Sequence, residues 1–346
     1  MSMMEERAYQ YLVDSKGEGG LVCELDRSPM LDKPTIIIGL GGTGIDAMLH
    51  AKYVIQRKIK APDGKKKPGR LAFIAIDTDE NAFKQKRVGD VRVDANEQVL
   101  IDEPKIATFM KNPELIPQDY LREWLCRGIN ADAITYGAGG IRQCGRFMLI
   151  NKAQNLIQRV SQAAAETWGA GKENGAGFTP DTGYTVYILT GISGGTGSGT
   201  FLDVAYLVRE IITNQVHKDV EIRGFIFMPD VNLCKVQDAA TRAYIPVNGY
   251  AALRELDFWM NAERGRNFVQ QYTPVVTVNT SAKPFDLCCL VSPNGALDTD
   301  YDNCMQTTGE ALMNIMTAPE NAQAMNFDSY ITNLGQLLNT AALKTT

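Results

Sequence analysis

Apolar residues in this chain form short unbroken runs that are rich in β-branched side chains. Such runs cover residues 35–39, 71–76, 184–190, 220–228 and 285–291, with a weaker one at 275–279. A strand that is apolar on both faces is typical of a parallel sheet that is covered on both sides. The runs therefore predict the buried strands of such a sheet.

Between these runs, apolar residues recur at helical spacing. The spacing predicts helices at 45–58, 142–166, 200–212, 246–265 and 302–316. Pro246 is expected in the first turn of its helix, where a missing N–H costs little. Strands that alternate with helices predict an α/β fold with a mostly parallel sheet.

Composition narrows the classes of function. The 346 residues include 35 basic and 40 acidic side chains, so the net charge of −5 gives no general attraction to nucleic acid. Seven cysteines without C-x-x-C spacing and two histidines do not indicate a disulfide framework or a zinc site. No apolar run approaches the roughly 18 residues of a membrane span, and the first residues lack a signal-peptide pattern. From the charge we expect no nucleic acid partner. From the cysteines and the lack of a long apolar run we expect a cytoplasmic protein with no direct membrane insertion.

A glycine-rich segment joins the predicted strand at 184–190 to the predicted helix at 200–212. Glycines let successive backbone N–H groups converge on one anion, and a helix N-terminus adds its positive dipole end. The segment has no lysine, whereas a Walker A loop ends in Gly-Lys-Ser/Thr. We therefore predict phosphate binding through backbone amides and hydroxyls. The candidate ligands are Gly194, Gly195, Thr196, Gly197, Ser198 and Gly199.

Two other glycine loops also precede predicted helices. The loop at 39–44 fits G-x-G-x-x-G, with Asp77 at the end of the next strand as in a dinucleotide-binding fold. A single loop of this kind is often only a tight turn, but three in one chain indicate a shared ligand. Arg142 or Arg146 either neutralises phosphate charge or forms a surface ion pair. The candidate ligands from these two loops are Gly41, Gly42, Thr43, Gly44, Gly137, Ala138, Gly139, Gly140 and Arg146.

Tyr244 and Asn248 are candidates for recognition of a base. They lie four residues apart near the predicted helix at 246–265, and residues at this spacing share one helix face. The ring offers a plane for stacking, and the carboxamide offers a donor and an acceptor for the edge of a base. A packed tyrosine and a helix-capping asparagine are the structural alternative.

Together these segments resemble the tubulin and FtsZ superfamily. The run 194–199 resembles its signature loop, and 137–139 followed by Gly145 and Arg146 resembles the FtsZ loop around the terminal phosphate. The sequence Asp77-Thr78-Asp79 is similar to the FtsZ acidic loop after the second strand, and 41–44 stands where the first phosphate loop stands. The resemblance covers about residues 34–292 and is greatest to divergent bacterial tubulin-like proteins.

The resemblance implies a Rossmann-like GTPase domain that binds GTP or GDP with Mg²⁺. It implies that Asp77 and Asp79 belong to the nucleotide site, that Asp230 or Asn232 contacts the ribose, and that Tyr244 and Asn248 contact guanine. It also implies a division of the chain. The parts are an N-terminal extension (1–33), a nucleotide-binding GTPase domain (34–245), a central helix (246–266) and a reduced or partial C-terminal domain (267–346).

In this superfamily GTP is hydrolysed when the next subunit docks head to tail and inserts an acidic loop. The resemblance therefore implies a homopolymer that forms filaments, with accessory cytoskeletal partners. The FtsZ pattern Asn-x-Asp-x-x-Asp does not occur after residue 265, so Asp298 or Asp302 is the candidate carboxylate, with an acidic helix cap as the alternative. A non-polymerising Rossmann-type protein that binds a nucleotide or NAD is the second class of function.

Overall fold

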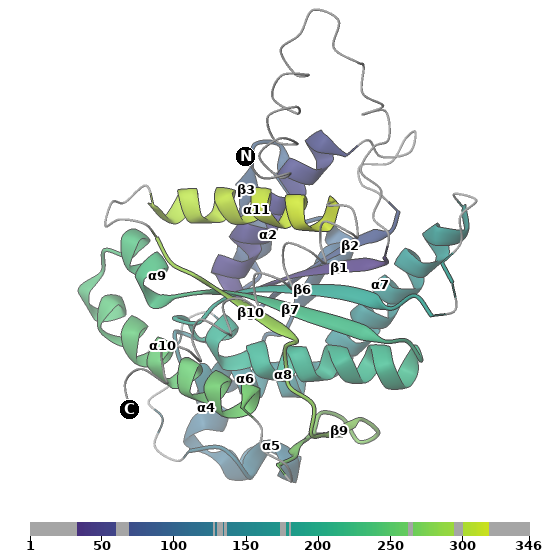
Figure 1. The fold of residues 1–346 in the computed structure, drawn as a ribbon. Helices are drawn as coiled ribbons and strands as arrows, with labels where there is room; N and C mark the ends of the chain where they lie inside the picture. Colours follow the sequence, from purple (N-terminus) through teal and green to yellow (C-terminus); the bar gives the residue numbers. More distant parts are fainter. Residues whose placement is uncertain are drawn as a thin grey trace, which may run out of the picture. The chain divides into compact units, whose positions relative to one another are not determined.

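A parallel sheet of six strands runs through the centre of the computed structural model (Figure 1). The structure describes residues 33–59, 69–126, 129, 134, 137–173, 178–179, 181–261, 266–293 and 300–317. The sheet strands are β1 (Thr35–Leu40), β2 (Leu71–Asp77), β5 (Gln98–Leu100), β6 (Tyr184–Gly191), β7 (Val220–Phe227) and β10 (Leu287–Val291). Each of these strands except β5 coincides with one of the predicted apolar runs. The predicted α/β class is confirmed.

The strand order across the sheet is β10-β7-β6-β1-β2-β5. The chain extends the sheet from β1 through β2 to β5, and then crosses to the other side of β1 to add β6, β7 and β10. As a result β1 pairs in parallel with β2 on one side and with β6 on the other. In open α/β sheets ligands bind at the carboxyl ends of the strands where the order reverses. In this sheet that point lies between Leu40 and Gly191.

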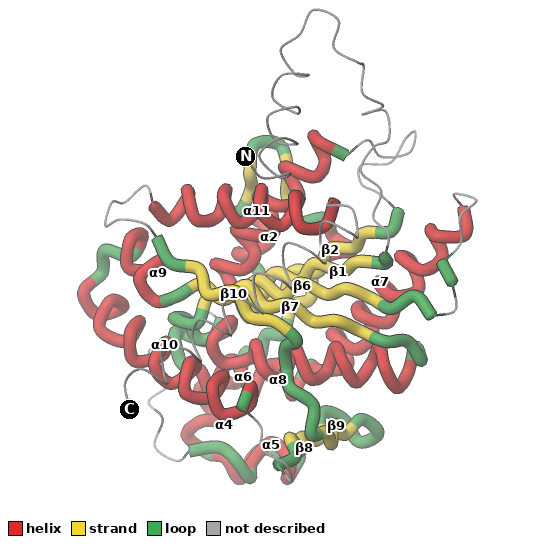
Figure 2. The backbone as a smooth tube through the Cα atoms, in the orientation of Figure 1, coloured by secondary structure: helices red, strands yellow, loops and turns green. Residues whose placement is uncertain are grey.

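Alternate side chains of the strands face two apolar layers. One layer contains Ile36 and Ile38 of β1, and the other contains Ile37. The first layer includes helices α6 (Arg142–Asn151), α7 (Ala153–Glu173), α8 (Thr196–Glu210) and α10 (Ala239–Met260), together with short helices. The second layer has α2 (Gly41–Lys58) and α11 (Asp300–Thr317), and Figure 2 displays helices on both sides of the sheet.

Short elements connect the larger ones. Strands β3 and β4 form one antiparallel pair, and β8 and β9 form another. The π-helical turn η3 follows α8, and α9 follows β7. The bounds are α3 (Asn81–Lys84), β3 (Arg87–Val88), β4 (Val91–Arg92), η1 (Ala95–Glu97), α4 (Ile106–Lys111), η2 (Pro113–Leu115), α5 (Asp119–Arg122), η3 (Ile211–Gln215), α9 (Pro229–Lys235), β8 (Phe268–Gln271) and β9 (Thr277–Thr280).

The bounds of the helices differ from the prediction. Helices α2 and α8 begin at Gly41 and Thr196, so part of each predicted loop forms the first turn of a helix. The predicted helix at 142–166 is divided into α6 and α7, because the backbone of Lys152 leaves the helical conformation (φ −111°, ψ 19°). Helix α10 begins at Ala239, so the prediction that Pro246 lies in a first turn was wrong. Asp238 caps this helix by accepting a hydrogen bond from the backbone N–H of Thr241.

The segment predicted as a reduced C-terminal domain contributes to the main sheet. Strand β10 lies within residues 267–346 and pairs in parallel with β7, and α11 adds apolar residues to the layer that contains α2. The predicted N-terminal extension, apart from Lys33, lies outside the described residues, and the domain boundaries stay a prediction. No helix in the described ranges is long and apolar enough to cross a membrane.

Candidate functional site

Three helices begin at glycine segments close to the carboxyl edge of the sheet. Helix α2 follows β1 at the first glycine loop (39–44), α8 follows β6 at the second glycine loop (194–199), and α6 follows the third glycine loop (137–146). Within the part of the chain that the structure describes, no side-chain hydrogen bond caps these helices at their N-cap residues Leu40, Gly195 and Ile141. The first turns therefore have N–H groups without a side-chain acceptor, and an anion is a suitable acceptor for them.

The first and second glycine loops touch through their backbones. A Cβ atom on Gly41 would lie 2.8 Å from the backbone nitrogen of Gly197, and Gly41 has a φ of +70°. A Cβ atom on Gly197 would lie 2.5 Å from the carbonyl oxygen of Gly191. Both distances are too short for a side chain, so these glycines are required by the close approach of the two loops.

The second and third loops are equally close. A Cβ atom on Gly195 would lie 2.7 Å from Cβ of Ala138 and 2.9 Å from the nitrogen of Ile141. In the third loop Gly137, Gly139 and Gly140 have φ values of +58°, +55° and +75°, in the left-handed region that favours glycine. The structure thus brings all three predicted loops together, as the sequence analysis expected.

Helices α6 and α8 also meet through glycines at their first turns. A Cβ atom on Gly145 would lie 2.3 Å from the carbonyl oxygen of Gly195, and one on Gly199 would lie 2.2 Å from that of Arg142. The two helix backbones therefore pack against each other at their N-terminal ends. This contact concentrates the positive ends of two helix dipoles in one region.

The hydroxyl of Thr78 connects three of the segments. It accepts a hydrogen bond from the backbone N–H of Ala138 at 3.0 Å and lies 2.7 Å from the hydroxyl of Thr196. From the sequence, Thr78 is part of the acidic loop but was not predicted to be a site residue. Its position between two aspartates at the end of a strand was the available signal.

Asp77 is a buried carboxyl group in this cluster. Its Oδ1 accepts hydrogen bonds from the backbone N–H of Asp79 at 3.0 Å and from the hydroxyl of Thr196 at 3.4 Å. Burial raises the pKa of Asp77 from the ordinary 3.8 to about 6, although the backbone amides of Asp79 and Thr78 and the charge of Lys86 lower it. Asp79 turns to its own loop, where it accepts from the N–H and the side chain of Asn81.

The residues predicted for the ribose lie in a short helix, α9, instead of a loop. The amide of Asn232 donates to the hydroxyl of Thr43 at 3.1 Å and so connects α9 to the first glycine loop. Asp230 accepts from the hydroxyl of Ser292. Asn232 is thus brought to the glycine loops, whereas Asp230 is engaged with the segment after β10.

Two buried polar atoms beside the loops have no hydrogen-bond partner within the described part of the chain. They are the hydroxyl of Ser193, on a residue that is only 2% exposed, and the side-chain carbonyl of Asn232. An unsatisfied buried polar group costs about 1–3 kcal/mol, so each such group in a native fold needs an explanation. Next to Ser193 in the chain, a Cβ atom on Gly194 would meet no atom within 4 Å apart from its chain neighbours. A polar ligand at this position accounts for both features.

The two arginines of the third loop are engaged in ion pairs. Arg146 makes a two-pronged contact with Asp203 of α8, at 2.9 and 3.1 Å, and its guanidinium stacks on Trp124. Arg142 donates to the hydroxyl of Ser198 at 2.7 Å and pairs with Glu255 of α10. In this geometry the guanidinium of Arg146, predicted as a nucleotide ligand, instead joins α6 to α8.

Tyr244 and Asn248 lie beside the third loop. The amide of Asn248 donates to the carbonyl oxygens of Gly140 and Ser193, both at 2.9 Å, and thereby ties two glycine loops to α10. A Cβ atom on Gly140 would lie 2.7 Å from the ring of Tyr244. Both residues are therefore at the site, and their recognition of a base stays a prediction.

Of the two candidate carboxylates, only Asp302 lies among the described residues. Asp302 is exposed in the first turn of α11, on the same side of the sheet as α2, and its charge acts on His50 of α2. Asp298 lies outside the described residues. No group of three or more His, Cys, Asp or Glu side chains in the described ranges is arranged to hold a metal ion.

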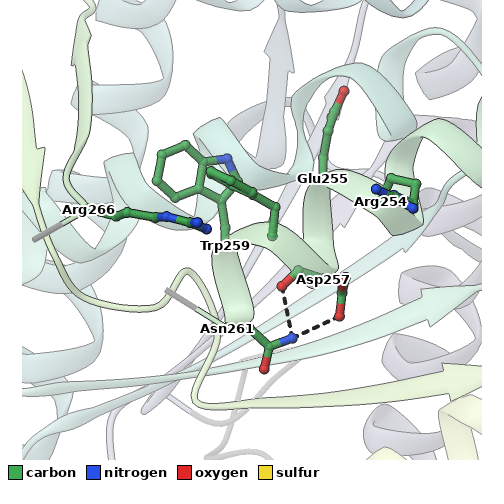
Figure 3. Close-up of a pocket in the computed structure, with 7 residues that line it drawn as sticks. Arg254, Glu255, Asp257, Trp259, Asn261 and Arg266 are labelled. Atoms are coloured by element: carbon green, nitrogen blue, oxygen red, sulfur yellow. Dashed lines mark hydrogen bonds between the residues drawn. The ribbon is translucent and has the colours of Figure 1, made fainter. Parts of the chain in front are cut away.

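Two cavities adjoin these elements. One of about 390 Å³ lies beside Thr78 and Gly137 and has the acidic side chains of Asp79, Asp102 and Glu103 in its wall, which disfavours an anion. The other, of about 410 Å³, lies at the C-terminal end of α10 (Figure 3). None of the predicted ligands lines this second cavity, so the glycine loops remain the better candidate site. Its lining residues are Arg254, Glu255, Asp257, Phe258, Trp259, Asn261 and Arg266.

Residues 36–344 match the model of the family described as tubulin like. The chain belongs to this tubulin-like family. A comparison with curated proteins gives no match in sequence. The assignment agrees with the resemblance that the glycine loops carry.

Solved structures of tubulin-like proteins are similar to this chain at low sequence identity. CetZ from Methanosaeta thermophila strain DSM 6194 is 14% identical with a TM-score of 0.47, over 87% of this chain and 59% of that chain. TubZ of Bacillus thuringiensis serovar israelensis, in GDP-form protofilaments, is 14% identical with a TM-score of 0.45, over 90% and 60%. An FtsZ dimer from M. jannaschii is 13% identical with a TM-score of 0.42, over 92% and 61%. The chain spans less than two thirds of the length of each of these proteins.

Proposed function

We propose that this tubulin-like chain binds a guanine nucleotide with its phosphates at the three glycine loops. The observation that carries the proposal is the meeting of three uncapped helix N-termini beside the unpartnered hydroxyl of Ser193 and carbonyl of Asn232. First-turn amides are donors for phosphate oxygens, and the carbonyl of Asn232 is an acceptor for a ribose hydroxyl.

The charge of the phosphates needs more than backbone amides. No lysine lies in the glycine loops, and the arginines beside the third loop are paired with carboxylates. Mg²⁺ bound to the phosphates would supply the positive charge, as in other phosphoryl-transfer sites. Thr43, Thr196 and Ser198 have hydroxyls that suit the outer shell of such an ion, and we infer that the metal arrives with the nucleotide.

The alternative of an NAD-binding Rossmann fold has less support. In that fold a carboxylate after the second strand accepts hydrogen bonds from a ribose. Here Asp77 is buried, and its Oδ1 already accepts from Asp79 and Thr196. A dinucleotide site also gives no reason for the second and third glycine loops to pack against the first.

We further propose that the chain assembles head to tail and that hydrolysis is completed by a carboxylate from the neighbouring subunit. Asp302 or Asp298 is the candidate for this group. An exposed carboxylate such as Asp302 is free to approach another subunit, and a head-to-tail contact that does not close produces filaments. The family assignment supports this proposal over that of a non-polymerising nucleotide-binding protein.

Thermal-shift measurements with GTP, ATP and NAD test the identity of the ligand. We expect GTP and GDP with Mg²⁺ to raise the unfolding temperature more than ATP or NAD at equal concentration, because only a bound ligand stabilises the native state. Stabilisation by NAD without stabilisation by GTP would overturn the proposal.

The variant Asn248→Ala tests the predicted recognition of guanine. A lost contact to the base lowers the preference for GTP over ATP, by about 1–3 kcal/mol if one side-chain group is left unpaired. A variant that is less stable but keeps the full preference would instead assign Asn248 to holding the loops at Gly140 and Ser193.

A further inference from the structure

A lysine from outside the glycine loops lies over the first of them. Lys86 follows α3, and its Nζ is 3.7 Å from the position that a Cβ atom on Gly42 would occupy. Gly42 therefore leaves the ammonium group directly above the bare backbone of the loop. The charge of the same ammonium group lowers the pKa of Asp77 at the end of β2, against the effect of burial.

A single carboxylate holds this lysine. Asp46, in the second turn of α2, accepts from Nζ of Lys86 at 2.7 Å and from the hydroxyl of Tyr301 at 2.6 Å. Nζ of Lys235 lies 3.5 Å from the same oxygen and over the ring of Tyr301. Two ammonium groups thus face one carboxylate. The side chain of Lys86 is 22% exposed, so its charge is partly shielded from solvent but still accessible.

We propose that Lys86 is the cationic phosphate ligand of this site and that Asp46 positions it over Gly42. The inference rests on the proposed nucleotide function and identifies a residue of the same site. A Walker lysine comes from the loop itself, whereas here the charge comes from a separate segment after β2. Of the two cations on Asp46, Lys86 has the closer contact and lies directly over the loop.

Equilibrium binding of GTP with Mg²⁺ at low and moderate salt tests this role. Lys86→Ala is expected to weaken GTP binding about tenfold to a hundredfold, as for the loss of one charge-assisted hydrogen bond. It should also reduce the salt dependence of binding, because an exposed ion contact is screened by salt. Lys86→Arg keeps the charge and should retain most of the affinity.

Two further variants separate a phosphate contact from a structural ion pair. Lys84→Ala removes an exposed lysine that pairs with Glu80, and GTP affinity should not change. Asp46→Asn keeps the charge of Lys86 but removes the carboxylate that positions it, and should weaken GTP binding less than Lys86→Ala does. Equal losses for Lys86→Ala and Asp46→Asn, or wild-type binding by Lys86→Ala, would overturn the inference. Failure of the wild-type protein to bind GTP would instead overturn the proposed function.

Discussion

Gly194 and Gly195 are neighbours in the chain with opposite surroundings. A side chain on Gly194 meets no atom within 4 Å, whereas one on Gly195 would clash with Ala138 and with the backbone of Ile141. We predict that Gly195→Ala lowers the free energy of unfolding by about 1–3 kcal/mol and that Gly194→Ala changes it by less than about 0.5 kcal/mol. Urea denaturation of both variants without nucleotide measures the difference. Equal losses would contradict the close packing of the second and third loops.

Titration of Asp77 makes the stability of the protein depend on pH. Its pKa is raised to about 6, so the unfolded chain binds fewer protons than the native state between about pH 4 and pH 6. The free energy of unfolding therefore decreases as the pH rises through this window, by up to about 3 kcal/mol from this residue. Asp77→Asn removes the contribution while keeping an oxygen for Asp79 and Thr196.

Denaturation of the wild-type protein and of Asp77→Asn at a series of pH values tests this prediction. The variant should gain stability relative to the wild-type protein from pH 4 to above pH 6, and the difference should then remain constant. A difference that is the same at every pH would show that Asp77 does not titrate in this range in the folded protein.

At the scale of elements, the ion pair of Arg146 and Asp203 joins the two helices that carry the second and third loops. Asp203 is buried, and it also accepts a hydrogen bond from Tyr272 after strand β8. Removing one partner of a buried pair leaves an uncompensated charge, so Arg146→Ala should cost about 3 kcal/mol of stability. The exposed pair of Arg57 with Asp90 provides a control, and Arg57→Ala should cost less than about 1 kcal/mol.

This experiment also distinguishes the two interpretations of Arg146. The structural role predicts a large loss of stability without nucleotide. A phosphate ligand predicts nearly unchanged stability and a large loss of GTP affinity. The second result would restore the assignment made from the sequence.

The sequence predicted strands more closely than helix starts, because a continuous apolar run alone identifies a buried strand. Buried strands such as β1 and β6 are continuous in apolar residues, and their positions were predicted closely. Helix starts were less predictable, because the glycines of 196–199 are typical of loops and yet form the first turn of α8. Pro246 favoured a helix start, but the cap at Asp238 and the packing of α10 on the sheet layer place the start earlier.

The sequence predicted which loops form the site, but it did not predict which side chains contact one another there. Glycine patterns identified the three segments because each needs backbone without side chains. The partners of Thr78, Arg146 and Lys86 come from segments distant in sequence, and only the fold determines them. Local spacing therefore assigned Arg146 to the phosphates and gave no role to Lys86.

For the whole molecule, the proposal predicts assembly that depends on the nucleotide. Sedimentation and negative-stain microscopy with GTP, GDP and a non-hydrolysable analogue should reveal filaments in at least one state. Filaments that are stable with the analogue and disassemble with GTP would indicate hydrolysis. The absence of filaments with all three nucleotides would contradict the polymer function.

Asp302→Asn tests the source of the hydrolytic carboxylate. Because Asp302 is exposed and in the first turn of α11, the variant should fold and bind GTP as the wild-type protein does. Phosphate release in the assembled state should fall at least tenfold if this group positions the water. Unchanged release would leave Asp298 as the remaining candidate from the sequence.

A crystal structure with GDP or a GTP analogue tests whether the three glycine loops form one phosphate site. We predict phosphate density against the backbone amides of the loops at Gly41, Gly137 and Gly194, with ligand atoms at the hydroxyl of Ser193 and the carbonyl of Asn232. A nucleotide bound in the cavity at the end of α10, or phosphates held away from all three loops, would contradict it.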